Sequence, residues 1–117
     1  MSDKLEIPKG ARILVSRTDR IGDLLLALPL AESIKLRHPD CEVDVMASLY
    51  ASPVVEQNPN IDGIVRVQLD QLIGNGRYRV ELQAKVSKLE FHTAVILYPE
   101  PHICRLLHRV GVPHRIG

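Results

Sequence analysis

A short polar run near the N-terminus carries the side chains best suited to chemistry. It lies between an apolar segment, residues 12–16, and a leucine-rich segment that begins at residue 21. Its polar and small members are Arg17, Thr18, Asp19, Arg20, Gly22 and Asp23. If a strand precedes the run and a helix follows it, the run lies beyond the carboxyl end of a strand, where open α/β sheets bind their ligands. A carboxylate there could take up a proton, and a guanidinium could bind an anion.

The same residues also have a purely structural interpretation. Asp19 and Asp23 could cap the following helix and pair with Arg17 or Arg20. Gly22 could let a substrate approach the backbone, or it could let a helix pack closely against a strand. Taken alone, the two aspartates fit the structural interpretation better than a catalytic one.

The elements needed to position this run are predicted on both sides of it. Residues 13–15 are continuously apolar, which is typical of a strand covered on both faces in a parallel sheet. Apolar residues then repeat at helical spacing, at Ile21, Leu24, Leu25, Leu28 and Ala31. This spacing predicts a helix with Asp19 as its N-cap, kinked at Pro29 and continuing to Arg37.

Strands and helices alternate along the rest of the chain. Strands are predicted over residues 42–47, 64–67 and 93–97 and within 112–117, and helices over 53–57, 80–89 and 103–110. Residues 70–77 are expected to form a turn-rich connection, and residues 99–101 a turn. This alternation predicts an α/β fold with a doubly wound, Rossmann-like parallel sheet over residues 12–117, preceded by a flexible lead, residues 1–11.

Composition excludes several classes of protein. The 117 residues suffice for one domain, and a net charge of +1 with one Phe, three Tyr and no Trp argues against nucleic-acid binding. No apolar run approaches the roughly 18 residues of a membrane span. Cys41 and Cys104 fit no CxxC pattern, which favours a reduced cytoplasmic chain, and a disulfide between them is the alternative that the sequence leaves open. The basic residues from Arg77 onward most often mean a solvated face, and they could also contact anionic lipids at the inner membrane.

Cofactor and metal sites are not indicated by any motif. Neither GxGxxG nor GxxxxGK[ST] follows the first strand, so no nucleotide cofactor is expected. His102, His108 and His114 invite a metal interpretation, because Cys104 shares a helix face with His108. Two ligands on one face are too few for a structural metal, and none is predicted.

Several segments together resemble a known family. They are RTDRIGD followed by an apolar helix with Pro29, then HPDCEVDVMAS, QNPNIDGIVRV and the closing FHTAVILYPEPHICRLLHRVGVPHRIG. This combination, over residues 12–117, resembles the N-terminal half of the family 9 glycosyltransferases, the ADP-heptose:lipopolysaccharide heptosyltransferases and their relatives.

The resemblance implies a GT-B enzyme with its active site between two Rossmann-like domains. The N-terminal domain would hold a lipopolysaccharide-core or related glycan acceptor, and the C-terminal domain an ADP-sugar donor. Transfer would invert the anomeric centre without a metal, with Asp23 as the general base. Acceptor phosphates and carboxylates would be bound by the loop residues Arg17, Thr18, Arg20 and Gly22. At the start of a helix and beside arginines Asp23 would be a weak base, so catalysis would rest on orientation and on closure of the second domain.

The donor-binding domain is expected to be absent from these 117 residues. On this view the chain alone would transfer little sugar, and its exposed apolar interface would favour self-association. The stretch Tyr98 to Pro101 departs from the Gly- or Ser-containing turn expected in the family. An alternative from another class remains: a stand-alone, noncatalytic α/β module that binds an anionic ligand or a protein partner through the same loop.

Overall fold

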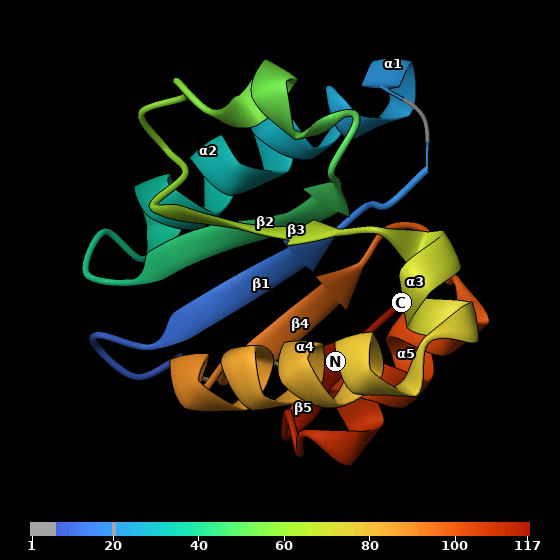
Figure 1. Cartoon of the computed structure of the whole chain (residues 1–117). Coiled ribbons are helices and arrows are strands. Elements are labelled where there is room, and N and C mark those ends of the chain that lie inside the picture. The colour runs from blue at the N-terminus through green and yellow to red at the C-terminus, as the bar shows by residue number, and fades with distance from the viewer. Residues whose placement is uncertain (1–6, 20) are drawn as a thin grey trace.

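The computed structural model describes residues 7–19 and 21–117, which build one five-stranded parallel sheet (Figure 1). The strands are β1 (Arg12–Ser16), β2 (Glu42–Ser48), β3 (Gly63–Val67), β4 (Thr93–Ile96) and β5 (His114–Ile116). Their order in the sheet is β3-β2-β1-β4-β5, so β1 is central and pairs with β2 on one side and β4 on the other. The predicted doubly wound α/β fold is confirmed.

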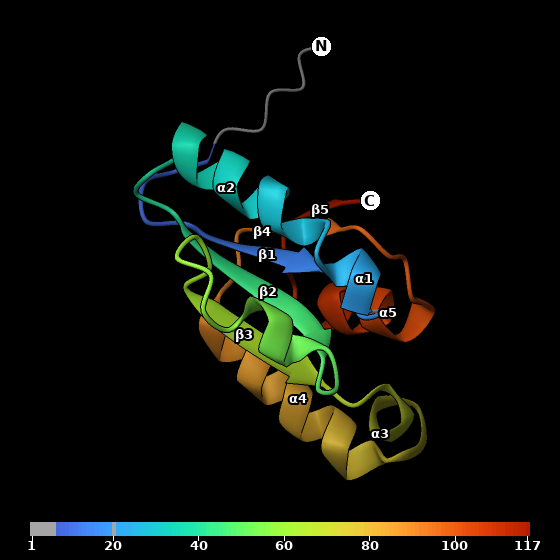
Figure 2. The same ribbon diagram turned by 90° about the horizontal axis from the view of Figure 1, so that it is seen from above.

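Helices cover both faces of this sheet (Figure 1). One face carries α1 (Ile21–Leu24), α2 (Ala27–Arg37) and the 3₁₀ helix η1 (Ser52–Val55), and the other carries α4 (Gly76–Leu89) and α5 (Pro101–Arg109). The short helix α3 (Leu69–Gly74) begins just after β3 ends. Figures 1 and 2 both place α1 and α3 beyond the carboxyl ends of the strands.

Two apolar cores lie on the two faces of the sheet. Successive strand residues point to opposite faces, so Leu14 packs in the core under α4 and α5 while Val15 packs with Ala27 and Ala31 of α2. Both side chains are fully buried. This double burial explains why the first strand is continuously apolar rather than alternating.

The predicted single kinked helix over residues 21–37 is wrong in detail, because the structure has two helices. The break lies at Leu25 and Leu26, between α1 and α2. Pro29 has no N–H to donate to the carbonyl of Leu25, and its ring would crowd that carbonyl, which favours a break at this turn. Pro29 therefore occupies the first turn of α2, where a missing N–H costs little.

The predicted turn-rich connection over residues 70–77 is also wrong, because it holds α3 and the start of α4. Leu72 anchors α3 in the core. The Asn75 side chain accepts hydrogen bonds from the backbone N–H groups of Arg77 at 3.0 Å and Tyr78 at 3.1 Å, so it caps α4. The remaining predicted elements are confirmed to within a few residues, with the short helix at 53–57 taking 3₁₀ form.

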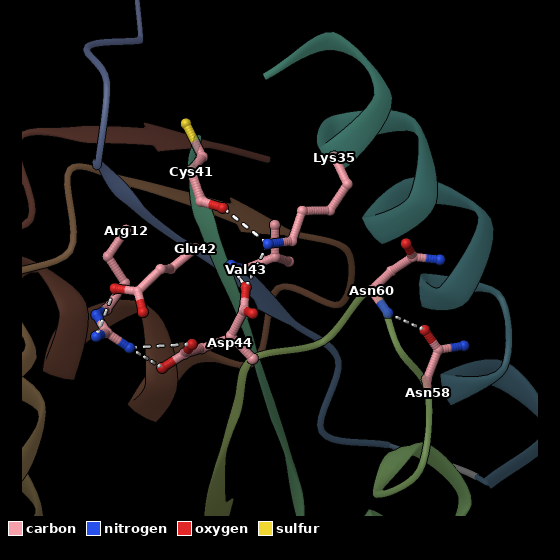
Figure 3. A network of polar contacts seen from close by, with 9 residues as sticks. Arg12, Lys35, Cys41, Glu42, Val43, Asp44, Asn58 and Asn60 are labelled. Atoms are coloured by element: carbon pink, nitrogen blue, oxygen red, sulfur yellow. Dashed lines mark hydrogen bonds and ion pairs between the residues drawn. The ribbon is translucent and has the colours of Figure 1, made fainter. Parts of the chain in front are cut away.

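Charged side chains form a closed network near the amino ends of the strands (Figure 3). Arg12 donates to both carboxylate oxygens of Asp44, at 3.2 and 3.0 Å, and to Glu42 at 2.8 Å. Beside it, the ammonium of Lys35 lies 2.7 Å from a carboxylate oxygen of Asp62. Burial raises the pKa of Asp44, and the Arg12 guanidinium only partly offsets that rise.

The segment before β1 joins the same end of the sheet. The N–H of Ala11 donates to the carbonyl of Pro8 at 3.1 Å, and the N–H of Gly10 donates to the backbone carbonyl of Asp40 at 3.2 Å. These bonds form a turn that is tied to the loop between α2 and β2. The first six residues of the predicted lead lie outside the described range.

Candidate functional site

The polar run after β1 lies where the winding of the sheet reverses. From β1 the chain proceeds through β2 to β3 on one side, and it then crosses to β4 and β5 on the other. The loops after β1 and β4 therefore flank the topological switch point, the usual ligand-binding position of doubly wound sheets. The expected placement of residues 17–19 and 22–23 at the carboxyl edge is confirmed.

Arg17 ties these two loops together. Its guanidinium donates to both carboxylate oxygens of Asp19, at 3.1 and 3.2 Å, and to the backbone carbonyl of Leu97 at 3.3 Å. Its backbone N–H donates to the carbonyl of Met46 in the second half of β2. The side chains of Arg17 and Asp19 are only 18% and 15% exposed. Arg17 thus holds the ends of β1, β2 and β4 in one fixed arrangement.

Asp23 lies in the four-residue helix α1, and its carboxylate is more accessible to solvent than that of Asp19. One of its oxygens lies 3.7 Å from the Arg17 guanidinium, and its side chain is 40% exposed. The ion pair of the structural interpretation is therefore present, yet the carboxylate still reaches solvent. Arg20, the second predicted acceptor-binding arginine, lies outside the described residues.

The Asp19 carboxylate accepts hydrogen bonds from Arg17. Its predicted role as N-cap of α1 stays a prediction, because residue 20 lies outside the described residues. Gly22 is exposed, and a Cβ built on it would meet no other atom within 4 Å. Close helix–strand packing is therefore not the reason for a glycine at this position, and the space beside its backbone is open.

Two hydroxyl groups beside Arg17 are buried without a hydrogen-bond partner among the described residues. They belong to Ser16, which is fully buried, and to Thr18, which is 7% exposed. A buried polar group left unpaired costs about 1–3 kcal/mol, and native structures keep such groups rare. Thr18 was among the predicted site residues, and Ser16 was not. The only sequence signal for Ser16 is a hydroxyl that ends an otherwise apolar strand.

Glu100 is a further buried carboxylate at this edge that sequence reasoning missed. It caps α5 by accepting from the N–H groups of His102 at 2.6 Å and Ile103 at 3.0 Å, and it also contacts the His102 ring at 3.2 Å. Burial alone would raise the pKa of Glu100, but the His102 ring and these N–H groups together outweigh it and lower the pKa. The signal was present in the sequence, since an acidic residue before Pro101 is a common helix start.

The candidate metal ligands do not converge. Within residues 7–19 and 21–117, no group of three or more His, Cys, Asp or Glu side chains is placed to hold a metal ion. His102 contacts Glu100, and the ring of His114 lies 4.7 Å from that of His92. Cys41 and Cys104 are both free thiols. No helix in the described part of the chain has the length and apolarity needed to cross a membrane.

Sequence comparison relates the chain to heptosyltransferases. No protein-family model matches it. It is 24% identical over 108 residues to lipooligosaccharide heptosyltransferase 2 of Haemophilus influenzae. It is 23% identical over 110 residues to lipopolysaccharide heptosyltransferase 2 of Escherichia coli K12. These matches cover 85% and 91% of this chain, but they span only 30% of the length of each relative.

Solved structures share the fold. A family 9 glycosyltransferase from Veillonella parvula superposes with a TM-score of 0.83 at 20% identity, over 96% of this chain and 33% of that one. The E. coli ADP-heptose lipopolysaccharide heptosyltransferase II superposes with a TM-score of 0.72 at 21% identity, over 89% of this chain and 29% of that one. The predicted resemblance to the N-terminal domain of the family 9 glycosyltransferases is confirmed.

Proposed function

We propose that this chain is the acceptor-binding part of a glycosyltransferase that moves a heptose, or a similar sugar, from an ADP-sugar to a lipopolysaccharide core or related glycan. Its relatives in sequence are heptosyltransferases, and its fold is that of family 9 enzymes. The observation that carries the proposal is Asp23, a solvent-reaching carboxylate held beside the switch point by Arg17.

Asp23 acts as the general base in this proposal. The acceptor hydroxyl gives its proton to the Asp23 carboxylate while its oxygen bonds to the anomeric carbon of the donor sugar. The bond from that carbon to the ADP oxygen breaks on the opposite face, so ADP leaves with the electron pair and the anomeric centre is inverted. The step balances, because Asp23 takes up the proton and ADP takes the electron pair, and the proposal assigns no metal to it. A positioned base of this kind typically contributes about 10²–10⁴-fold in rate.

The acceptor contacts are assigned to the groups around Asp23. The unpartnered hydroxyls of Ser16 and Thr18 are candidates for hydrogen bonds that form only in the working enzyme. An anion bound by Arg17 would have to displace or share the Asp19 carboxylate, since the guanidinium is already engaged on two edges. We therefore assign Arg17 mainly to orienting Asp23, and the direct anion contact to Arg20. The open side of Gly22 leaves room for the acceptor beside the backbone.

The donor sugar requires a second domain that faces this edge. Large apolar side chains are exposed around the carboxyl side of the sheet, where they follow α1, β2 and β4. They are Leu25, Leu26, Leu49, Tyr50 and Tyr98. Such side chains are typical of a surface that packs against another domain. The proposed place of work is the cytoplasmic side of the inner membrane, where an ADP-sugar meets a lipid-linked acceptor.

The test is an Asp23→Asn substitution in a protein where this chain is joined to a donor-binding domain. Transfer from ADP-heptose to a lipopolysaccharide-core acceptor should fall by at least about 10²-fold, because the amide cannot take the proton. Acceptor binding should change little. The matched control is Asp70→Asn, which removes an exposed carboxylate on α3 and should leave transfer unchanged.

Retained transfer in the Asp23→Asn protein would show that another group is the base. A native protein with the mass of this chain alone, 13.1 kDa, and with no partner supplying a donor domain would instead favour the noncatalytic binding module. Intact mass measurement of the protein from its source cells separates these two cases.

A further inference from the structure

A concave surface between α3, α4 and α5 collects positive charge outside the site already described. This groove has a volume of about 320 Å³ and lies on the α4 and α5 side of the sheet (Figure 1). It is lined by Arg79, Arg105, Arg109 and His102, whose ring contacts Glu100 at 3.2 Å, and its apolar lining includes Leu72 and Leu106. No Asp or Glu is among the described residues that line it.

The three arginines come from two helices and are not neutralised by carboxylates. Arg105 and Arg109 are four residues apart on α5, so they share a face, and both are exposed. Among the described residues, no carboxylate lies within 4 Å of Arg79, Arg105 or Arg109. Arg105 and Arg109 repel each other at this spacing, while Arg109 in the last turn of α5 interacts favourably with the helix dipole, so the pair contributes little net stability.

Arg79 is held in place from the opposite wall. Its guanidinium donates to the backbone carbonyl of Leu72 in the last turn of α3, at 3.2 Å. That carbonyl has no partner within the helix, so the bond satisfies it and fixes the arginine at the same time. When the remaining N–H groups of this guanidinium bind a ligand, the side chain loses less conformational freedom than a mobile surface arginine would lose.

We propose that this groove binds a phosphorylated ligand through Arg79, Arg105 and Arg109. Guanidinium groups form paired hydrogen bonds with phosphate oxygens, and a concave site lined by one sign of charge strengthens its own field. The volume admits a group the size of a small phosphorylated sugar, at the lower end of ordinary ligand sites. The apolar lining from Leu72 and Leu106 would cover the uncharged part of such a ligand. This proposal does not depend on the transferase assignment, because it uses none of residues 17–23.

The test titrates the whole chain with inorganic pyrophosphate and follows its backbone amide signals by NMR. Signals from α3, the first half of α4, and α5 should shift together. The double variant Arg105→Gln/Arg109→Gln should weaken binding by at least about tenfold, because it removes two charge-assisted contacts and each contributes several-fold to the affinity. The matched control is Arg77→Gln/Lys88→Gln on α4, which removes the same charge outside the groove and should weaken binding by less than about twofold.

A second arm identifies the source of the phosphate. Sedimentation is measured with phosphatidylcholine vesicles that contain phosphatidic acid. If the groove variant loses both pyrophosphate and vesicle binding, the ligand class includes lipid head groups; if only pyrophosphate binds the parent chain, it is a soluble phosphate ester. Equal weakening in the groove and control variants, or no binding in either arm, overturns the proposal. Thermal unfolding of the groove variant should occur close to the parent temperature, because the opposing effects of repulsion and helix dipole are of similar size, and this separates a lost site from a lost fold.

Discussion

The two ends of the parallel sheet treat their polar side chains differently. At the amino ends of the strands, Arg12 is shared between two carboxylates, and Lys35 bonds both Asp62 and the Cys41 carbonyl (Figure 3). At the carboxyl ends, Arg17 is equally well bonded, but two hydroxyls beside it are buried without partners and Asp23 reaches solvent. At the amino ends the charged groups are paired with one another, whereas at the carboxyl ends two buried hydroxyls lack a hydrogen-bond partner among the described residues.

This contrast distinguishes an end of the sheet that stabilises the fold from an end that is suited to binding a ligand. A sequence under selection for folding alone satisfies its buried polar groups, and departures from that rule are expected where a ligand is bound. The difference between the ends is measurable, because substitutions at the amino end should cost stability while some at the carboxyl end should not.

The largest effect is expected from Arg12→Met. Asp44 is almost fully buried and would keep a carboxylate without its cation. Removing one partner of a buried pair typically costs 3–5 kcal/mol; Arg12 is itself partly exposed, so a loss of about 3 kcal/mol in the free energy of unfolding is expected. Urea unfolding measures it. Arg12→Met combined with Asp44→Leu should recover most of the loss.

Arg17→Met is the corresponding substitution at the other end. Asp23 is already 40% exposed and can return to water, and only Asp19 is left well covered. The expected loss is about 1–2 kcal/mol. An equal or larger loss than for Arg12→Met would break the comparison, since it would make the carboxyl end the structural anchor.

Gly63→Ala tests how tightly the amino-end network is packed. A Cβ at Gly63 would lie 3.0 Å from a carboxylate oxygen of Asp44, which cannot retreat without leaving Arg12. We expect a loss of about 1–2 kcal/mol. The control is Gly74→Ala in α3, where a Cβ meets nothing within 4 Å, and this change should be neutral or mildly stabilising. Equal effects from the two glycines would mean that the carboxylate can move freely.

Thr18→Val sharpens the comparison from the other side. The hydroxyl is buried and unpaired among the described residues, so replacing it with a methyl group of similar shape should stabilise the chain by about 0.5–1 kcal/mol. Thermal unfolding measures the change. A clear destabilisation would show that the hydroxyl has a partner in solution, such as a bound water.

The smallest effect is a pH dependence at the amino end. Burial, with a smaller contribution from the nearby His114, lowers the pKa of His92 below its usual 6.5. The unfolded chain then takes up this proton at a higher pH than the folded chain does, so stability is lost as the pH falls below about 6.5. Urea midpoints between pH 7.5 and 5.5 measure the slope, and His92→Gln should flatten it. Asp62 and Glu100 have lowered pKa values, and they lose their contributions only in more acidic solution.

Much of the fold was predictable from three short segments: the continuous apolar run around Ile13, the alternating pattern around Val45, and the compact β-branched segment around Val65. The errors have local causes. Asn75 lies between two glycines and resembles a loop, yet its side chain caps α4. Pro29 was expected to kink a helix that the structure instead divides at Leu25 and Leu26, and the i−4 rule for proline allows either a kink or a break.

The site was predictable only where its contacts are local. The pairing of Arg17 with Asp19, two residues apart, was anticipated from the sequence. The bond from Arg17 to the Leu97 carbonyl joins residues 80 positions apart and depends on β4 lying beside β1. The spacing of residues in the sequence does not predict that strand order. Ser16 stayed hidden for the same reason, because its burial depends on the strands around it. Glu100 was missed although its contacts with His102 and Ile103 are local.

The central place of β1 has a consequence for how the chain assembles during synthesis. Its first neighbour, β2, follows it closely in the sequence, whereas its second neighbour, β4, begins only at Thr93. A ribosome that has released residues up to β3 has therefore made three strands that can pair, with one edge of β1 still open. That edge carries Ile13, Leu14 and Val15, and an open apolar edge readily pairs with another chain. Slow translation between β3 and β4 should therefore favour aggregation of the nascent protein.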